Sequence, residues 1–193
     1  MNEKKAKLLT PVGFAKWAWL NKPKLFKDEK GNPKGEPKFQ IEVYFDPTNP
    51  EWKTWAGTLQ ALINSIPVQK NGDGEPMPKQ KLFRKELDEH DVPTGRFFVT
   101  FKTNEKFKPG VFDKYGQEMP DSVMVGNESA VRVNYSPSTY TAFGGGVNLY
   151  LNAVQVINLI EYKSHTAKSF GFEAEALPPG QGAPPQAEDD LPF

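Results

Sequence analysis

The stretch FQIEVYF, residues 39–45, alternates strictly between two kinds of side chain. One parity holds Phe39, Ile41, Val43 and Phe45, and the other holds Gln40, Glu42 and Tyr44. A period of two is typical of a half-buried β-strand, in which alternate side chains face a hydrophobic core. The sequence therefore predicts a strand here, with its aliphatic and phenylalanine side chains pointing inward.

The same signal recurs along the chain. Residues 12–20 are predicted to form a strand because they are rich in β-branched and aromatic side chains. Residues 95–103 alternate, with Phe97, Val99 and Phe101 inward, and residues 130–135 alternate as well, so a strand is predicted for each. Residues 147–159 alternate too, but their apolar parity switches near Ala153. Such a switch indicates a β-bulge or a sharply bent barrel strand.

A single helix is predicted after the strand at 39–45. Asn49 can cap the first turn, and Pro50 has the fixed φ that suits the first helical position. The apolar residues then follow a helical stripe that ends before Pro67, so we expect both tryptophans of the stripe to be core anchors. The stripe consists of Trp52, Trp55, Leu59, Leu62, Ile63 and Ile66. Residues 79–91 fit either a short helix or a short strand.

Five strands with one interposed helix and no βαβ periodicity predict a mainly β fold, an antiparallel five-stranded barrel. We expect one folded domain over residues 1–162. Two loops interrupt it, a long basic one at 21–37 and a mobile one at 136–146 that carries two aromatic residues. Residues 163–193 are rich in proline and glycine and poor in apolar side chains, which predicts a disordered tether.

Charge is distributed unevenly although it sums to zero. Five of the 24 acidic residues lie at or after Glu173, and none of the 24 lysines and arginines does. The preceding body therefore carries five more bases than acids, which suggests a domain that binds a polyanion and bears an acidic appendage. The appendage could occupy the cationic surface of its own domain.

The last five residues combine acidic charge with a terminal aromatic ring: Asp189, Asp190, Leu191, Pro192 and Phe193. Such a tip offers a ring for a pocket, a carboxylate for a basic group and negative charge for steering. We expect it to bind protein partners; the alternative is a tail that merely keeps the domain soluble.

Several classes of chemistry are disfavoured. The chain has no cysteine and only two histidines, so one copy cannot build a thiolate or imidazole zinc cluster. No nucleophile is spaced for catalysis with either histidine, and Gly144–Gly146 precede a strand with no following Lys-Ser or Lys-Thr, unlike a phosphate-binding loop. We expect a protein with no catalytic residue, no metal and no cofactor.

The charged N-terminus lacks a signal-peptide or membrane-spanning stretch, which predicts a soluble, unexported protein.

Binding residues are better represented. Cations that neutralise phosphates and exposed rings that stack unpaired bases are what a single-stranded nucleic acid requires. On the strands, we expect Arg96, Phe98, Lys102 and Arg132 to share an outward face, with Lys106, Phe107 and Lys108 just beyond it. From the loops and the final strand we add Lys22, Lys24, Lys27, Tyr140, Phe143 and Tyr150. The alternative is that Phe98 belongs to a second core and the lysines form a solvated rim.

Three phrases in the order 39–47, 107–113 and 145–156 (FQIEVYFDP, FKPGVFD, GGVNLYLNAVQV) resemble bacteriophage single-stranded DNA-binding proteins with an OB-fold. The resemblance covers about residues 8–160. It implies a barrel that coats single-stranded DNA during phage replication, recombination or repair in the cytoplasm of the infected bacterial host. It also implies an acidic tail that recruits replication proteins.

Two other functions remain open at this point. The chain could be a phage recombination or structural protein that uses its barrel for protein contacts. A metal-dependent nuclease would need Asp113, Asp121 and Glu128 to gather around Mg²⁺. The preference for DNA over RNA, the number of nucleotides covered and the oligomeric state, with a homodimer as one option, are not fixed by the sequence.

Overall fold

The computed structural model describes residues 8–33 and 35–162. Within them the chain forms eight strands and one α-helix, together with a short 3-10 turn at Ala142–Gly144. The elements are β1 (Leu8–Leu9), β2 (Gly13–Lys24), β3 (Lys38–Phe45), α1 (Pro50–Ser65), β4 (Arg84–Leu87), β5 (Pro93–Asn104), β6 (Gly110–Phe112), β7 (Ala130–Tyr140) and β8 (Gly146–Asn158). The predicted tether and tip, at 163–193, lie outside the described residues.

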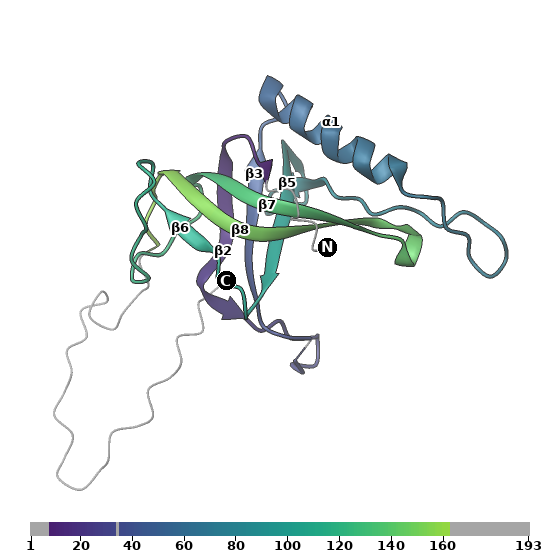
Figure 1. Ribbon diagram of the computed structural model, residues 1–193, viewed down its shortest axis with the longest axis horizontal. Coiled ribbons are helices and arrows are strands. Elements are labelled where there is room, and N and C mark those ends of the chain that lie inside the picture. Colours follow the sequence, from purple (N-terminus) through teal and green to yellow (C-terminus); the bar gives the residue numbers. More distant parts are fainter. Residues whose placement is uncertain (1–7, 34, 163–193) are drawn as a thin grey trace, which may run out of the picture. The chain divides into compact units, whose positions relative to one another are not determined.

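Five of the strands form a closed ring in the order β2, β3, β5, β8, β7 and back to β2 (Figure 1). All of these pairings are antiparallel except that of β5 with β8, which is parallel. β1 extends the sheet from β7, β4 from β5 and β6 from β8. The predicted mainly β, five-stranded barrel with one interposed helix is confirmed.

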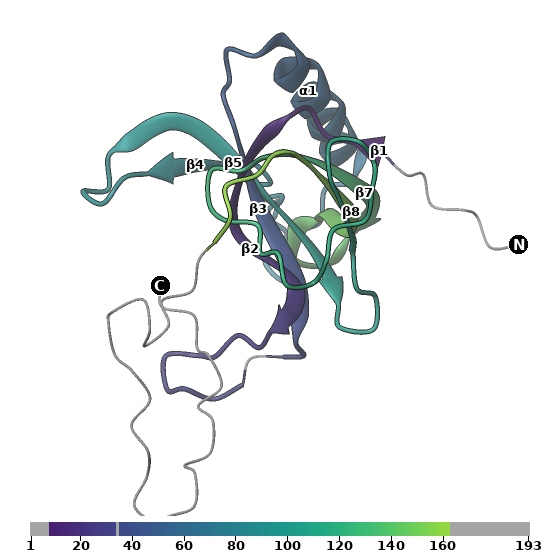
Figure 2. The same cartoon turned by 90° about the vertical axis from the view of Figure 1, so that its left-hand side faces the viewer.

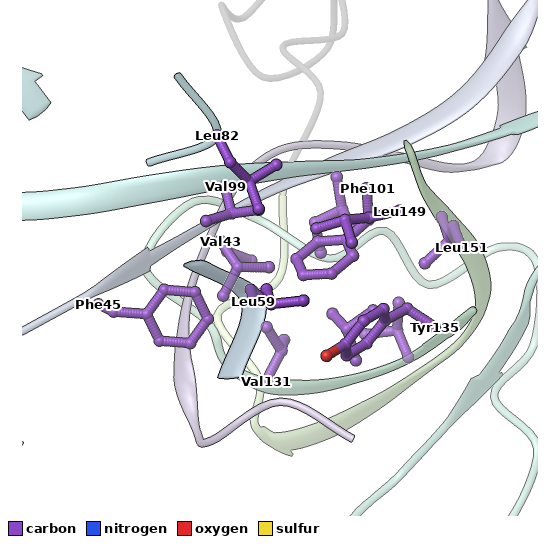
Figure 3. Close-up of a cluster of buried hydrophobic side chains, with 14 of the residues drawn as sticks. Val43, Phe45, Leu59, Leu82, Val99, Phe101, Val131, Tyr135, Leu149 and Leu151 are labelled. Atoms are coloured by element: carbon purple, nitrogen blue, oxygen red, sulfur yellow. The ribbon is translucent and has the colours of Figure 1, made fainter. Parts of the chain in front are cut away.

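The barrel interior is filled by the inward parity of its strands (Figure 3). Ile41 and Val43 of β3 and Val99 and Phe101 of β5 are fully buried. Burying a side chain of this size stabilises the fold by about 1.5–3 kcal/mol, so the alternation seen in the sequence fixes which face of each strand points inward.

Helix α1 lies against one end of the barrel in both views (Figures 1 and 2). Trp52 stacks on Phe45 of β3 with ring centroids 4.8 Å apart, and the Nε1 of Trp55 donates a hydrogen bond to the hydroxyl of Tyr135. Both tryptophans are therefore the core anchors that the helical stripe predicted. Together they join the helix to two strands of the ring.

The helix begins as the sequence predicts, because the Asn49 side chain accepts a hydrogen bond of 2.9 Å from the Glu51 amide. We expect Asn49→Ala to lower the free energy of unfolding by about 1 kcal/mol, since this amide would lose its side-chain acceptor. Asn49→Asp retains the acceptor and is the matched control. Urea unfolding measures both, and equal stabilities for the two variants would contradict the capping role.

Two strands extend further than the sequence indicates. β2 continues through Pro23 to Lys24, and β7 continues to Tyr140, although both segments were predicted to be loops. Each extension has a partner strand, since Lys24 lies opposite Lys38 and Tyr140 lies opposite Gly146. Pairing with a distant segment, which local composition does not reveal, determines where these strands end.

The predicted irregularity in the last strand is a β-bulge at Asn152. Asn134 of β7 pairs with Ala153 and Tyr135 pairs with Leu151, so Asn152 is the extra residue. Its side-chain amide donates hydrogen bonds to Asn134 Oδ1 and Ser136 Oγ, both 3.0 Å long. The bulge accounts for the switch in buried parity along β8.

The segment at 79–91 that fitted either a helix or a strand contains β4. Before β4, Lys79 caps α1, because its Nζ donates to the backbone carbonyls of Ile63, Asn64 and Ile66. A lysine at this position satisfies carbonyls that have no partner within the helix.

None of the helices in the described part of the chain is long and apolar enough to cross a membrane.

Candidate nucleic-acid interface

A row of outward side chains crosses four strands of the barrel. Trp19 of β2 lies opposite Gln40 of β3, Gln40 lies opposite Lys102 of β5, and Lys102 pairs with Tyr150 of β8. Residues directly opposite each other in a sheet point to the same side, so the row presents two rings with a cation between them. We call it the Trp19–Tyr150 row.

A groove with a volume of about 680 Å³ opens over part of this row. Four cationic side chains line it, namely Lys38, Lys81, Arg84 and Lys102, against the single carboxylate of Glu36. Glu36 accepts a hydrogen bond of 2.7 Å from the side chain of Asn104. The cations therefore outnumber the acids in the lining, as a site for a polyanion requires.

Lys102 shows how crowded these cations are. Burial, followed by the charges of Lys38 and Arg84, lowers the pKa of the Lys102 ammonium below its usual value, and only Glu42 acts in the opposite direction. Like charges this close raise the free energy of the empty groove, so a bound phosphate would relieve the repulsion.

The aromatic side chain of Phe98 is enclosed in this face. Tyr44 of β3 stacks on it with ring centroids 4.9 Å apart, and the Arg84 guanidinium of β4 lies 4.5 Å from its centroid. Because β3 and β4 flank β5 on opposite sides, the two neighbours cover opposite faces of the Phe98 ring. Phe98 thus supports Arg84 and has no free face for a base.

Arg96 shares the outward parity of Phe98, but its charge is already paired. Its guanidinium makes two hydrogen bonds to Glu86, of 2.6 and 2.9 Å, and two to Glu128, of 2.9 and 3.0 Å. Glu128 and Glu86 raise the pKa of Arg96 further. We therefore remove Arg96 from the expected phosphate contacts.

Arg132 lies away from the groove. It is opposite Gln155 of β8, whereas the pair of Lys102 on that strand is Tyr150. Five residues along a strand correspond to about 16 Å. The predicted single face of four residues is thus corrected: Phe98 and Lys102 lie on it, Arg96 is held by carboxylates at its end, and Arg132 is elsewhere.

The lysines predicted in the first loop have different settings. Lys22 and Lys24 belong to β2, whereas Lys27 pairs with Pro33 in the loop. Lys24 is close to the groove, because it lies opposite Lys38 and its Nζ is 4.3 Å from the ring centroid of Trp19. Lys22 and Lys27 do not line the groove.

Beyond the end of β5, the turn at 105–109 presents Phe107, whose exposed fraction is 69%. The amide of Lys106 donates to Asn104 Oδ1, and the ammonium of Lys108 pairs with Asp121. Phe107 and Lys106 therefore lie next to Asn104, which lines the groove, while the charge of Lys108 is partly neutralised.

The β7–β8 hairpin carries Phe143 at its tip, 88% exposed and in the left-handed region at φ 53°. The three following glycines are buried, and β7 with the 3-10 turn occupies most of the segment that was predicted to be a loop. A Cβ at Gly145 would lie 2.7 Å from Ile66 Cγ2, and the Gln80 side chain accepts a hydrogen bond from the Val147 amide. Close packing against the segment after α1 holds the hairpin, with Tyr140 half-buried at its base.

The carboxylates considered for a magnesium site are used otherwise. Asp113 accepts hydrogen bonds from the backbone amides of its own turn, Asp121 pairs with Lys108, and Glu128 binds Arg96. Among residues 8–33 and 35–162, no three histidine, aspartate or glutamate side chains gather as metal ligands.

Sequence reasoning missed four cationic or aromatic residues of this surface: Trp19, Lys38, Lys81 and Arg84. Lys81 and Arg84 fall in the segment that had no predicted structure, and Trp19 was assigned only to a strand. The even parity of residues 38–44 was a usable signal, because it places Lys38 on the same side as Gln40.

No protein-family model matches the sequence, and neither does any curated protein. Solved structures do match. The single-stranded DNA-binding protein gp2.5 encoded by bacteriophage T7 superimposes with a TM-score of 0.57 and 18% identity, over 93% of this chain and 100% of that one. The single-stranded DNA-binding protein from bacteriophage Enc34, in complex with ssDNA, superimposes with a TM-score of 0.55 and 18% identity, over 79% of this chain and 86% of that one.

The chain has the OB-fold of these phage proteins. In this OB-fold, β2, β3, β5, β7 and β8 are the five successive barrel strands. The groove lies over β5, beside the loop that joins β2 to β3 and beside the start of β8. Oligonucleotide ligands of OB-folds bind on the second and third strands and on the loops between strands one and two and between four and five. The cationic groove occupies that position.

Proposed function

We propose that the protein binds single-stranded DNA without regard to sequence, and that it coats and protects this DNA during phage replication, recombination or repair in the infected cell. The observation that carries the proposal is the cationic groove, which lies where OB-folds bind oligonucleotides. The Enc34 protein, whose structure was solved with ssDNA, shares the fold.

Such binding requires two kinds of contact, and the groove together with the exposed rings of two turns offers both. Lys38, Lys81, Arg84 and Lys102 neutralise phosphates, while Tyr150 and the exposed rings of Phe107 and Phe143 offer surfaces for bases. Stacking contributes about 1–3 kcal/mol per base and does not depend on which base it is. Phosphate contacts are equally indifferent to sequence, so the binding is sequence-tolerant.

Recruitment of protein partners is assigned to the acidic tip, Asp189, Asp190, Leu191, Pro192 and Phe193, on the chemistry of its sequence.

A second candidate function is protein binding by the barrel itself. It is favoured by exposed Leu87 and Val92, 49% and 55% accessible, on the arm that β4 and the adjoining part of β5 form (Figure 2).

A titration with oligo-dT at two salt concentrations tests the proposal. We expect quenching of tryptophan fluorescence at micromolar protein and an apparent affinity that falls steeply with salt, with a slope of about −0.7 per neutralised phosphate. An RNA oligonucleotide of matched length reports the preference for DNA. Absence of binding at low salt would contradict the proposal and favour the protein-binding alternative.

A further inference from the structure

Trp19, like the buried Gln40 beside it, belongs to the Trp19–Tyr150 row but lies outside the groove lining. It is partly exposed on the outer face of β2, opposite Gln40. The register of β2 and β3 shifts on both sides of this pair, so irregular strand geometry positions the indole. The structure thus places an accessible aromatic ring beside the cationic groove.

One face of this ring is covered by a cation. The Nζ of Lys24 lies 4.3 Å from the Trp19 centroid and 5.8 Å from that of Phe26. Lys24 also lies directly opposite Lys38, and like charges at such a position repel. The cation–π contact with Trp19, which is one of the interactions of Lys24, contributes about 0.5–1 kcal/mol at an exposed site, whereas stacking of a base on the ring contributes about 1–3 kcal/mol.

We propose that Trp19 is a base-stacking position, and that Lys24 covers it in the free protein and moves to a phosphate when a base displaces it. This inference rests on the proposed function, because it assumes that single-stranded nucleic acid enters the groove. It assigns to the two side chains a shared role that neither has alone: the lysine shields the indole from water and becomes a phosphate ligand on binding.

The Trp19–Tyr150 row also indicates the path of a bound single-stranded nucleic acid across the barrel. Counted through β3 and β5, Trp19 on β2 and Tyr150 on β8 lie three strands apart, about 14 Å along the surface of the sheet at the usual strand spacing. Lys102 lies between them on the same face. A single strand that stacks a base at each end of the row therefore crosses the barrel strands and passes its phosphates over Lys102.

Tryptophan fluorescence of the full chain tests this assignment. Of the four tryptophans, Trp52 and Trp55 pack in the core. Trp17, 40% exposed, lies in the irregular part of β2, where its amide donates to Asn127 instead of β3. We expect Trp19→Phe to abolish most of the quenching by oligo-dT, and the matched control Trp17→Phe to retain it.

Binding is measured in parallel by the anisotropy of a labelled oligo-dT, so that failures of the two hypotheses can be distinguished. We expect Trp19→Leu to weaken binding about 10-fold, and Lys24→Met to reduce the salt slope by about 0.7 while the quenching persists. If Trp19→Phe binds the labelled oligonucleotide and is still quenched as strongly as the wild type, the inference is wrong and the proposed function stands. If the wild type does not bind, the proposed function itself fails. Thermal unfolding shows whether each variant is folded.

Discussion

We expect the triple substitution of Lys38, Arg84 and Lys102 by methionine to weaken oligo-dT binding about 100-fold at physiological salt. The three side chains line one groove, and each is expected to make one phosphate contact. At about 1 kcal/mol per lost contact, the total loss of about 3 kcal/mol corresponds to this factor. The dependence on salt should weaken as well, with the slope of log affinity against log salt falling by about 2.

A control must distinguish the loss of cations in the groove from the loss of net positive charge on the protein as a whole. Lys53, Lys70 and Lys114 are exposed and do not line the groove, so their replacement by methionine removes the same charge elsewhere. We expect this control to bind within about threefold of the wild type, because distant charges are screened at physiological salt. Equal losses in the two triple variants would show that the protein attracts DNA only through its overall charge.

The second large effect concerns stability. Glu86 is 95% buried on β4, and its carboxylate accepts hydrogen bonds from Arg96, Thr94 and Lys16. Burial acts to raise the pKa of Glu86, but these hydrogen bonds, with that of Arg96 foremost, outweigh it and lower the pKa to about 2. We expect Glu86→Gln to lower the free energy of unfolding by about 3 kcal/mol at pH 7.

The lowered pKa of Glu86 also determines how the free energy of unfolding depends on pH. A carboxylate whose pKa is lower in the folded than in the unfolded protein contributes its full stability above the unfolded value of about 4.5. That contribution is lost as the pH falls toward 2, because the unfolded chain then binds the additional proton. Urea unfolding at pH 7 and pH 3 should therefore show a smaller drop for Glu86→Gln than for the wild type. Glu89→Gln, at an exposed position, is the control and should match the wild type at both pH values. Parallel pH profiles for all three proteins would contradict the role of Glu86.

Much of the fold could be predicted from local patterns. The alternation of residues 39–45, the capped helix that begins at Pro50 and the parity switch near Ala153 each correspond to an observed element. These features could be predicted because burial on one face imposes a period on the sequence itself. The ends of β2 and β7 depend on partner strands far along the chain, and local composition therefore misplaced them.

The site was harder to predict, because parity gives the side on which a residue lies but not what lies beside it. Arg96 has the expected parity, yet Glu128, 32 residues away, neutralises it. Phe98 has the expected parity too, but it is enclosed between Tyr44 and Arg84. Arg132 was placed on the same face without knowledge of the strand order. Such contacts arise from the closure of the barrel, which one sequence does not reveal.

The pairing between neighbouring strands of the barrel is shortest between β5 and β8. In the described part of the chain, β5 and β8 share a single register pair, Lys102 with Tyr150, whereas every other join in the ring has at least two. The cationic groove spans this seam, since side chains of both strands line it. A ligand that contacts both β5 and β8 links the two strands where their pairing is shortest, so occupancy of the groove and resistance to unfolding rise together.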